Sequence, residues 1–233
     1  MTTPRRISAT QAATAPRLLS ATRTSDSAEA PSATLVRGTL TGVIRHTLGV
    51  VLAGGKSQRM GTDKALLPLD GTTFVQHAVD VLGAVFADVI VAGGTAEVAR
   101  TVSVPVVPDV VEDGGPLAGL ISAFEYEPDR SIFLLATDMP FVTATEVRSV
   151  ADPVVSGVHA RIAVAAGRDQ PLCGTYGRGC FSKAMYGTAS GDLSMHAFLR
   201  RVGNVERVHI DLPDQLANVN TPAEYEAVTR DTF

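Results

Sequence analysis

Cysteine and tryptophan are the scarcest residues in this sequence, which has only Cys173 and Cys180 and no tryptophan. Two cysteines are too few for a disulfide framework, and their spacing does not match a metal site, so we expect a reducing, cytoplasmic environment. No apolar run approaches the roughly 18 residues that a membrane helix needs, which argues against a membrane partner. Because 45% of the residues are hydrophobic, we expect a soluble globular protein.

Basic charge is also scarce beyond the first residues of the chain. The net charge is -4, and the first 46 residues carry six arginines against Asp26 and Glu29, or +4, which leaves -8 for the remainder. A globular part without a basic excess is not expected to bind nucleic acid.

Residues 1–45 are rich in Ser, Thr, Ala, Arg and Pro and show no sustained apolar periodicity. Such a segment cannot bury enough surface to offset its ordering entropy, so we expect a disordered N-terminal extension. Its acid-free beginning also suits an organellar transit peptide, although an unstructured tail or an upstream start codon is the preferred interpretation. Residues 46–233 are expected to form a single domain.

From residue 47 onward, short apolar runs alternate with helical patterns. We expect strands over 47–53, 87–93, 104–109 and 131–138, and helices over 72–86, 115–127 and 143–152. This alternation predicts βαβ units, and hence a Rossmann-like, three-layer α/β/α fold with a mostly parallel sheet. Ligands of such sheets bind at the carboxyl ends of the strands.

The second half of the chain departs from this alternation. The runs 161–167 and 170–176 lie too close together for a helical crossover, so they predict a small antiparallel element. Two helical patterns, a strand and a last helix are then expected over 179–187, 192–202, 205–211 and 221–229.

A glycine-rich turn, VVLAGGKSQRMGTDKALLPLDG, follows the first predicted strand at residues 50–71. A Walker loop would need glycine where Val50 stands, and the dinucleotide pattern G-x-G-x-x-G is absent. What remains is a long loop with Lys56, Arg59 and Lys64, three cations that could surround a triphosphate.

The order LAGGxSxRMGxDKALL resembles the signature of nucleotidyltransferases that activate small molecules, and most closely that of the molybdenum cofactor guanylyltransferases. The resemblance implies that the predicted α/β/α fold is the nucleotidyltransferase fold. It also implies catalytic roles for Arg59 and Lys64. The turn residues implied to bind nucleotide are Leu52, Ala53, Gly54, Gly55 and Lys64. A glycine turn with solvated cations is the structural alternative, which the clustering of the cations disfavours.

Asp109 closes the third predicted strand and is followed by EDGGPLAG, a second glycine turn that opens a helix. The turn resembles the base-recognition loop of the family, which implies that Asp109 and Gly115 bind the nucleotide. A carboxylate can accept hydrogen bonds from N1–H and the exocyclic amine of guanine. A helix cap or turn residue is the alternative role for Asp109.

Asp138 follows an apolar strand in LLATDMPF, where the family usually has CDMP and this chain has Thr137 in place of the cysteine. A lone carboxylate there suits Mg²⁺, which takes one or two protein carboxylates and completes its octahedron with water and phosphate oxygens. Asp138 is therefore the expected metal ligand, nucleotide contact and catalytic residue. Its alternative role is a strand-end cap.

The segment LANVNTPAEYEAV resembles a family segment that reaches the active site. The resemblance implies Asn220 as a second metal or phosphate contact and Asn218 as a contact to the acceptor substrate. Thr221 as N-cap and Pro222 at the first helical position would also make a good helix start in the absence of any function.

On this resemblance the expected reaction transfers GMP from GTP to the terminal phosphate of molybdenum-molybdopterin and releases pyrophosphate, with Mg²⁺ as cofactor. Arg168, Asn218 and Asn220 are the named acceptor contacts, with Gln170 and the PLCxxY-like strand as further candidates. Transient contacts with molybdenum insertion proteins and recipient molybdoenzymes are also expected. Cys173 is expected to be a small buried side chain.

Other side chains near these motifs have weaker assignments. Met139 and Phe141 could border the pterin or serve packing, and His196 is expected to be a satisfied or surface histidine. The turn VAGGTAEV has no asparagine where related enzymes often place one near the nucleotide.

Two other functions remain open at this point. A cytidylyltransferase of the same cofactor, or of another small phosphate, would keep the chemistry and change the base, although LAGG and GPLAG resemble the guanylyl members. A noncatalytic nucleotide-binding protein would account for the loops, but it would not require Arg59, Lys64 and Asp138 together.

Overall fold

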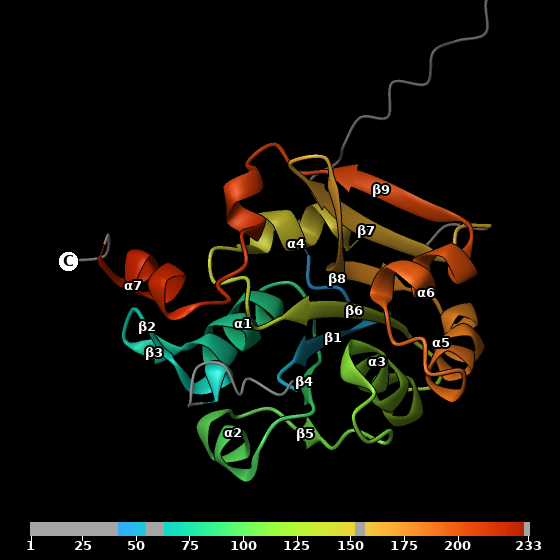
Figure 1. The fold of residues 1–233 in the computed structure, drawn as a ribbon, viewed down its shortest axis with the longest axis horizontal. Helices are drawn as coiled ribbons and strands as arrows, with labels where there is room; N and C mark the ends of the chain where they lie inside the picture. The colour runs from blue at the N-terminus through green and yellow to red at the C-terminus, as the bar shows by residue number, and fades with distance from the viewer. Residues whose placement is uncertain (1–41, 55–62, 152–156, 231–233) are drawn as a thin grey trace, which may run out of the picture. The chain divides into compact units, whose positions relative to one another are not determined.

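Seven strands form one sheet in the order β5-β4-β1-β6-β8-β7-β9 in a computed structural model, which describes residues 42–54, 63–151 and 157–230 (Figure 1). The strands of this sheet are β1 (Thr47–Leu52), β4 (Val89–Ala92), β5 (Val106–Val107), β6 (Ser131–Ala136), β7 (Ala160–Ala165), β8 (Arg168–Tyr176) and β9 (Val205–His209). A small antiparallel sheet pairs β2 (Pro68–Leu69) with β3 (Thr72–Thr73).

The sheet is mostly parallel, as the sequence predicts. β5, β4, β1 and β6 run parallel to one another, and β7 runs parallel to β9. β8 runs antiparallel to both of its neighbours, β6 and β7, and with β7 it forms the predicted hairpin.

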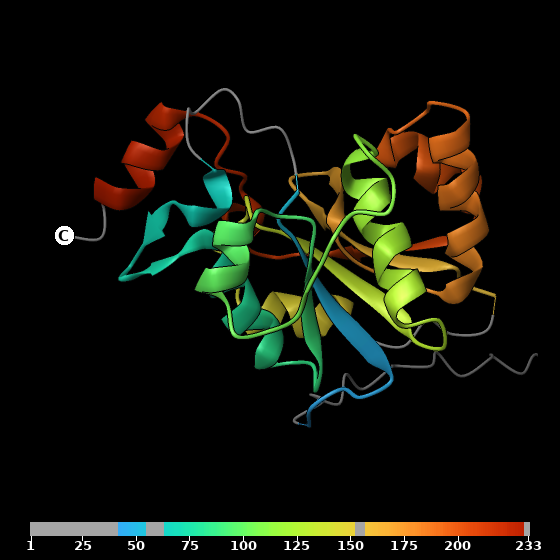
Figure 2. The same ribbon diagram turned by 90° about the horizontal axis from the view of Figure 1, so that it is seen from below.

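Helices cover both faces of the sheet, which confirms the three-layer α/β/α fold (Figure 2). One face packs against α1 (Phe74–Gly83), α2 (Ala96–Thr101) and α4 (Ala144–Val150), and the other packs against α3 (Gly115–Tyr126), α5 (Phe181–Ala189) and α6 (Met195–Val202). Alternate residues of one strand enter the two cores: Phe133 and Leu135 of β6 join the first, and Leu134 joins the second. Burial on both faces explains the continuous apolar runs of β1 and β6.

The remaining elements are α7 (Pro222–Arg230) and three short 3-10 helices, η1 (Lys64–Leu66), η2 (Arg178–Cys180) and η3 (Pro213–Leu216). Among the described helices, none is long and apolar enough to cross a bilayer.

Several predicted elements are shorter in the structure, and two of them have a clear local cause. The helix expected over 72–86 begins at Phe74, because the Thr73 side chain caps it by accepting the N–H of Gln76 at 3.3 Å, and residues 72–73 pair as β3. The strand expected over 104–109 is only Val106–Val107, flanked by Pro105 and Pro108, which cannot donate to a β ladder. Asp109 therefore lies two residues beyond its strand instead of ending it.

The packed chain also begins before residue 46. Ile44 is 6% exposed, its N–H donates to the Val85 carbonyl at 2.8 Å, and it forms a parallel bridge with Phe86. Residues 42–45 therefore belong to the domain, whereas the rest of the expected N-terminal extension lies outside the described residues.

An irregularity in β8 interrupts its pairing with β7. The β7–β8 register shifts between Ile162, which pairs with Gly174, and Ala163, which pairs with Gln170. Pro171, Leu172 and Cys173 therefore have no register partner on β7. The buried hydroxyl of Tyr176 reaches back and donates to the Pro171 carbonyl at 2.6 Å.

We predict that Tyr176→Phe lowers the free energy of unfolding by about 1–3 kcal/mol, because it leaves a buried carbonyl without its side-chain donor. Tyr186→Phe is the matched control, since Tyr186 is 65% exposed, and it should change stability by no more than about 0.5 kcal/mol. Urea denaturation followed by circular dichroism measures both. Equal midpoints for the two variants would show that the hydroxyl does not stabilise the β8 irregularity.

Candidate active site

The candidate site lies where the order of the parallel strands reverses. The chain passes from β1 to β4 and β5 on one side and returns to pair β6 on the other side of β1. A crevice forms at the carboxyl ends of strands at such a point, and ligands bind there in open α/β sheets. A pocket of about 300 Å³ occupies this position.

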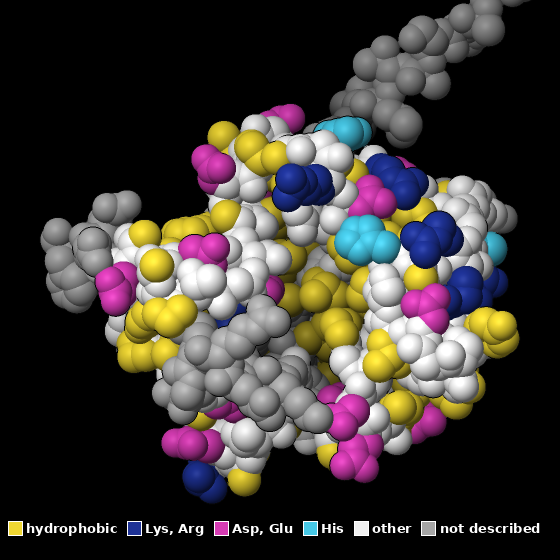
Figure 3. Space-filling model, viewed as in Figure 1, with side chains coloured by type: hydrophobic (Ala, Val, Ile, Leu, Met, Phe, Trp, Pro, Cys, Tyr) yellow, Lys and Arg dark blue, Asp and Glu magenta, His cyan; other side chains and the backbone are white. Residues whose placement is uncertain are grey.

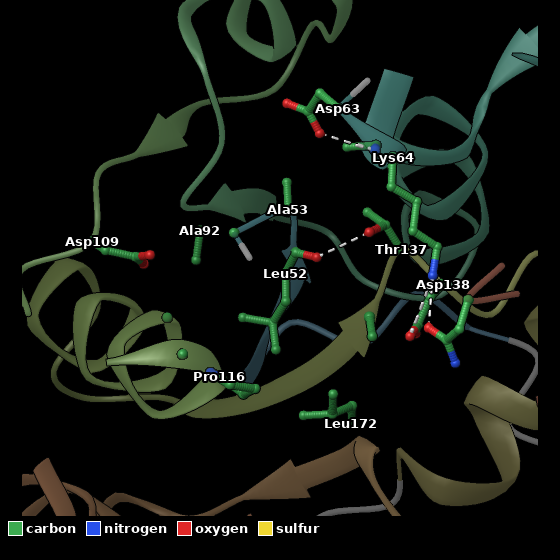
Figure 4. A pocket seen from close by; sticks show the side chains of 16 residues that line it. Leu52, Ala53, Asp63, Lys64, Ala92, Asp109, Pro116, Thr137, Asp138 and Leu172 are labelled. Atoms are coloured by element: carbon green, nitrogen blue, oxygen red, sulfur yellow. Dashed lines mark hydrogen bonds and ion pairs between the residues drawn. The ribbon is translucent and has the colours of Figure 1, made fainter. Parts of the chain in front are cut away.

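Most of the predicted nucleotide-binding residues line this pocket. The lining includes Leu52, Ala53, Gly54, Lys64, Asp109, Gly115 and Asp138, together with Asn220. Gly55 and Arg59 lie outside the described residues, as does Lys56. Figure 4 shows Lys64 and Asp138 together on one side of the pocket and Asp109 on the other, with Leu52, Ala53 and Ala92 between them.

A second pocket of about 480 Å³ shares Gly54, Asp63 and Asp109 with the first and extends toward Thr95 and Asp113. Figure 3 shows that the surface is hollowed near the middle of this face, with apolar side chains inside the hollow.

Lys64 and Asp138 form the charged centre of the pocket. The Lys64 Nζ lies 3.7 Å from the Asp138 Oδ2 and donates a hydrogen bond to the Asn220 Oδ1 at 2.9 Å. Burial raises the pKa of Asp138, an effect that the nearby Lys64 ammonium opposes. Burial likewise lowers the pKa of Lys64 despite its attraction to Asp138. The two charges therefore attract each other in a poorly solvated place.

Lys64 is the first residue of η1, which Asp63 caps. The Asp63 Oδ1 accepts the N–H of Ala65 at 3.1 Å, and its Oδ2 accepts a hydrogen bond from the Thr95 hydroxyl at 3.3 Å. The Thr95 Oγ1 also caps α2 by accepting the N–H of Val98. The turn that carries Lys64 is thus tied to the end of the β4–α2 loop.

Asp138 is held in place by its backbone. The N–H of Thr137 continues the β1–β6 ladder to the Leu52 carbonyl at 3.4 Å, and the Asp138 carbonyl accepts the N–H of Val219 at 2.9 Å. Met139, next in the chain, is 3% exposed and packs in the core, which is the packing role that the sequence left open for it. The Asp138 Oδ1 is buried and has no hydrogen-bond partner in the described part of the chain.

Asp109 lies over two glycines at the strand ends. A Cβ built on Gly54 would lie 3.0 Å from the Asp109 Oδ2, and one on Gly93 would lie 2.9 Å from the Gly54 Cα. Gly93 also has φ +74, a conformation that favours glycine. Because neither glycine has a Cβ, the two backbones approach closely and still leave room for the Asp109 carboxylate. Burial between the pocket walls raises the pKa of Asp109.

The N-terminus of α3 forms the neighbouring wall. Gly115 and Pro116 begin the helix and line the pocket, and the N-cap Gly114 makes no side-chain capping bond. The first N–H groups of a helix lack intrahelical partners and carry the positive end of its dipole. This wall can therefore face a negatively charged ligand.

Two of the proposed acceptor contacts are not part of the pocket. Arg168 begins β8 in an exposed position, and Asn218 is exposed on the stretch before Asn220; neither lines either pocket. Leu172, which the sequence did not single out within its strand, does line the first pocket. The β8 irregularity that carries Leu172 has no simple sequence signature.

Three further side chains differ in burial. Cys173 is fully buried, and burial raises the pKa of its thiol to about 12, in keeping with a packing role. His196 is exposed on α6, and it lines a separate pocket with Asp169 and Arg207. Phe141 is 42% exposed and lines neither pocket at the strand ends.

The last helix starts as the sequence predicts. Glu224 N–H donates to the Thr221 Oγ1 at 3.2 Å, and the Glu224 carboxylate accepts the N–H of Thr221 at 2.9 Å. This reciprocal capping box also reaches Asn220, whose N–H donates to the Glu224 Oε2 at 2.6 Å.

Comparison with known proteins identifies relatives along most of the described chain. The probable molybdenum cofactor guanylyltransferase of Pelotomaculum thermopropionicum is 32% identical over 182 residues, covering 76% of this chain and 88% of that protein. The protein of the same description from Mycobacterium tuberculosis is 35% identical over 187 residues, covering 77% and 91%. The structure of molybdopterin-guanine dinucleotide biosynthesis protein A from Archaeoglobus fulgidus shares the fold, with a TM-score of 0.67 at 20% identity, covering 79% of this chain and 98% of that one.

The family match covers the sheet and most of the pocket. Residues 49–207 match the MobA-like NTP transferase domain, a range that begins in β1 and ends in β9. It includes Lys64, Asp109 and Asp138, and Asn220 lies beyond it. The chain belongs to the MobA-like nucleotidyltransferase family.

Proposed function

We propose that this protein transfers GMP from GTP to the terminal phosphate of molybdenum-molybdopterin, forming the molybdopterin guanine dinucleotide and releasing pyrophosphate. The observation that carries the proposal is the placement of Asp138 and Lys64, 3.7 Å apart, in a pocket that also contains Asp109. The descriptions of the relatives support the same reaction.

In this reaction an oxygen of the acceptor phosphate attacks the α-phosphorus of GTP. The bond from that phosphorus to the bridging oxygen breaks, and the electron pair leaves with pyrophosphate. Such chemistry depends mainly on positioning and on opposing negative charge, so it needs no nucleophilic side chain. We propose that the Lys64 ammonium and Arg59 oppose the charge on the transferring and leaving phosphates.

The residues present fit a magnesium ion. The buried Asp138 Oδ1 has no hydrogen-bond partner in the described chain, and a cation would satisfy it. Asn220 Oδ1, which accepts from Lys64 in this structure, is the proposed second oxygen ligand. The described residues contain no cluster of three or more acidic, histidine or cysteine ligands, in keeping with an ion held largely by phosphate and water. When bound, Mg²⁺ would neutralise phosphate charge at this position.

Asp109 is the proposed base-reading residue. Its carboxylate lies on the side of the pocket opposite Lys64 and Asp138 (Figure 4). This separation supports assigning the base to the Asp109 end and the phosphates to the Lys64 end. Carboxylate oxygens accept the N1–H and amine of guanine, whereas cytosine offers only an amine on that edge. A site of this kind can discriminate strongly, because the wrong base leaves a buried polar group unpaired.

The proposal extends to the acceptor and the compartment. Asn220 lies in the pocket, and we retain Arg168 and Asn218 as acceptor contacts outside its described lining. Both cysteines are unbridged, which favours a reducing cytoplasm. In that compartment the product would pass to recipient molybdoenzymes through transient contacts. The protein would also make transient contacts with molybdenum insertion proteins.

The first test is incubation of the purified protein with molybdenum-loaded molybdopterin, Mg²⁺ and GTP, CTP or ATP. We expect dinucleotide and pyrophosphate with GTP, at least about 100-fold faster than with CTP, because a hydrogen-bonding site rejects a mismatched base by this order or more. Chromatography of the product and a pyrophosphate assay measure both rates. A preference for CTP would overturn the guanylyl assignment while leaving nucleotidyl transfer in place.

Asp138→Ala is expected to lower the rate of transfer about 100- to 1,000-fold, because it removes the proposed carboxylate ligand of the Mg²⁺ ion that would neutralise phosphate charge. The protein should remain folded, because neither the bond from the Val219 N–H to the Asp138 carbonyl nor the bond from the Thr137 N–H to the Leu52 carbonyl involves the Asp138 side chain. Asp169→Ala is the control, since it removes an acidic side chain outside both pockets at the strand ends. Near-normal transfer by folded Asp138→Ala protein would remove Asp138 from the reaction.

Asp109→Asn tests base recognition. It preserves size but replaces one acceptor oxygen with a donor, so the rate ratio of GTP to CTP should fall by about 10-fold or more, the equivalent of about 1.4 kcal/mol. The measurement is kcat/KM for each nucleotide. An unchanged ratio would place base recognition on other groups of the pocket.

A further inference from the structure

We propose that Glu224 is a positioning residue of the active site: its carboxylate fixes the backbone of Asn220, and the Asn220 side chain fixes the ammonium group of Lys64. The inference rests on the proposed guanylyl transfer, in which Lys64 opposes phosphate charge. Glu224 itself lines neither pocket at the strand ends.

The contact between Glu224 and Asn220 is short and charge-assisted. The Glu224 Oε2 accepts the N–H of Asn220 at 2.6 Å and the N–H of Thr221 at 2.9 Å. Hydrogen bonds to an ionised carboxylate are stronger than those between neutral groups. The Asn220 N–H is the main cause that lowers the pKa of Glu224, with the Thr221 N–H a lesser cause, so the carboxylate stays charged at neutral pH.

The segment before Glu224 is therefore held at two backbone points. The N–H of Val219 donates to the Asp138 carbonyl at 2.9 Å, and the N–H of the next residue, Asn220, donates to Glu224. The Val219 side chain is buried in a cluster with Leu69 and Phe74. With its backbone fixed on both sides, Asn220 can direct its Oδ1 at the Lys64 Nζ, 2.9 Å away.

This restraint matters because lysine is flexible. Its ammonium group stands on a four-carbon stem, and holding it in one place costs side-chain entropy. Asn220 supplies a fixed acceptor for the ammonium beside Asp138. A displacement of about 1 Å in a charge-stabilising group can lower a rate by up to about 100-fold.

A purely structural role for Glu224 makes a different prediction. Glu224 also belongs to the capping box of α7, in which its N–H donates to the Thr221 Oγ1 at 3.2 Å. If capping were its whole role, losing either half of the box would have the same effect. Within the described part of the chain, the Thr221 hydroxyl makes no hydrogen bond to Asn220 or Lys64, so Thr221→Val is a matched control for capping.

The kinetic test compares four proteins in the guanylyl transfer assay. Glu224→Ala should lower kcat about 10-fold with little change in KM for GTP, because an interaction important to the transition state is misplaced. Thr221→Val should stay within about twofold of the wild type, and Glu224→Gln, which keeps an acceptor oxygen, should lose only about threefold. Equal losses from Glu224→Ala and Thr221→Val would overturn the positioning role in favour of capping.

A double-mutant cycle tests whether Glu224 acts through Asn220. In an Asn220→Ala background, Glu224→Ala should change kcat by less than about twofold, since the contact that it supports is already gone. If the loss of kcat in the double variant equals the product of the two single-variant losses, Glu224 acts independently of Asn220 and the inference is rejected.

Amide hydrogen exchange gives a readout that does not depend on turnover. The Asn220 amide should exchange slowly in the wild type and in Thr221→Val, and at least about 10-fold faster in Glu224→Ala. The Tyr225 amide, which donates to the Thr221 carbonyl in the first turn of α7, reports fraying of the helix as such. Equal acceleration at Asn220 and Tyr225, or none at Asn220, would contradict the inference.

The two kinds of measurement separate failure of the inference from failure of the proposed function. A wild-type protein that forms no dinucleotide would refute guanylyl transfer, whereas the exchange comparison would still test whether Glu224 fixes Asn220. Faster exchange at Asn220 with unchanged kcat would refute only the claim that Glu224 positions Lys64.

Discussion

The parallel pairing of β1 with β6 is the constraint on which the candidate site depends. The register places Leu52 level with Ala136, the last residues of the two strands. Gly54 and Asp138 each follow two residues later, so the glycine turn and the carboxylate emerge side by side. Because β4 and β5 continue on the other side of β1, Asp109 reaches the same edge at a distance from Asp138 (Figure 4). The separation of the two carboxylates follows from the strand order.

A small satellite cluster lies beside the Lys64 end of the pocket. Leu69, Phe74 and Val219 are buried together, and Tyr225 packs its ring edge against Phe74 and donates its hydroxyl to the Pro68 carbonyl at 3.0 Å. This cluster joins the segment after η1 to the segment before α7. Lys64, at the start of η1, and Asn220, just before α7, adjoin those two segments in the chain, so this packing contact helps to keep their hydrogen bond in place.

The sequence predicted best those features that depend on local pattern. The buried strand at 131–138 and the hairpin at 161–176 follow from apolar runs and short spacing, and the position of Asp138 follows from its place after a strand. Proline explains one failure: Pro105 and Pro108 limit β5 to two residues. The six-residue helix α2 was missed because it is too short to show a periodic pattern.

Contacts between distant segments could not be read from the sequence. Asn218 and Asn220 flank the buried Val219, but only Asn220 makes a hydrogen bond to Lys64. Which asparagine makes this bond depends on how the segment packs against Asp138. Arg168 was selected from its motif alone, and the hairpin carries it to an exposed position. The sequence Thr-Pro-Ala-Glu at residues 221–224 was visible as a helix start. The link from Glu224 through Asn220 to Lys64 becomes visible only in the three-dimensional structure.

The balance of charge in the first pocket bears on how a triphosphate would bind in the proposed reaction. In the described part of its lining, the carboxylates of Asp63, Asp109 and Asp138 accompany the single ammonium of Lys64. A triphosphate entering such a site would meet net repulsion, which poor solvation strengthens. Further positive charge must therefore accompany it. Lys56 and Arg59 lie within eight residues of Lys64 in the sequence, close enough along the chain to supply part of that charge, and a cation on the Asp138 Oδ1 would supply the remainder. In the proposed reaction, nucleotide affinity would therefore depend on both sources of positive charge.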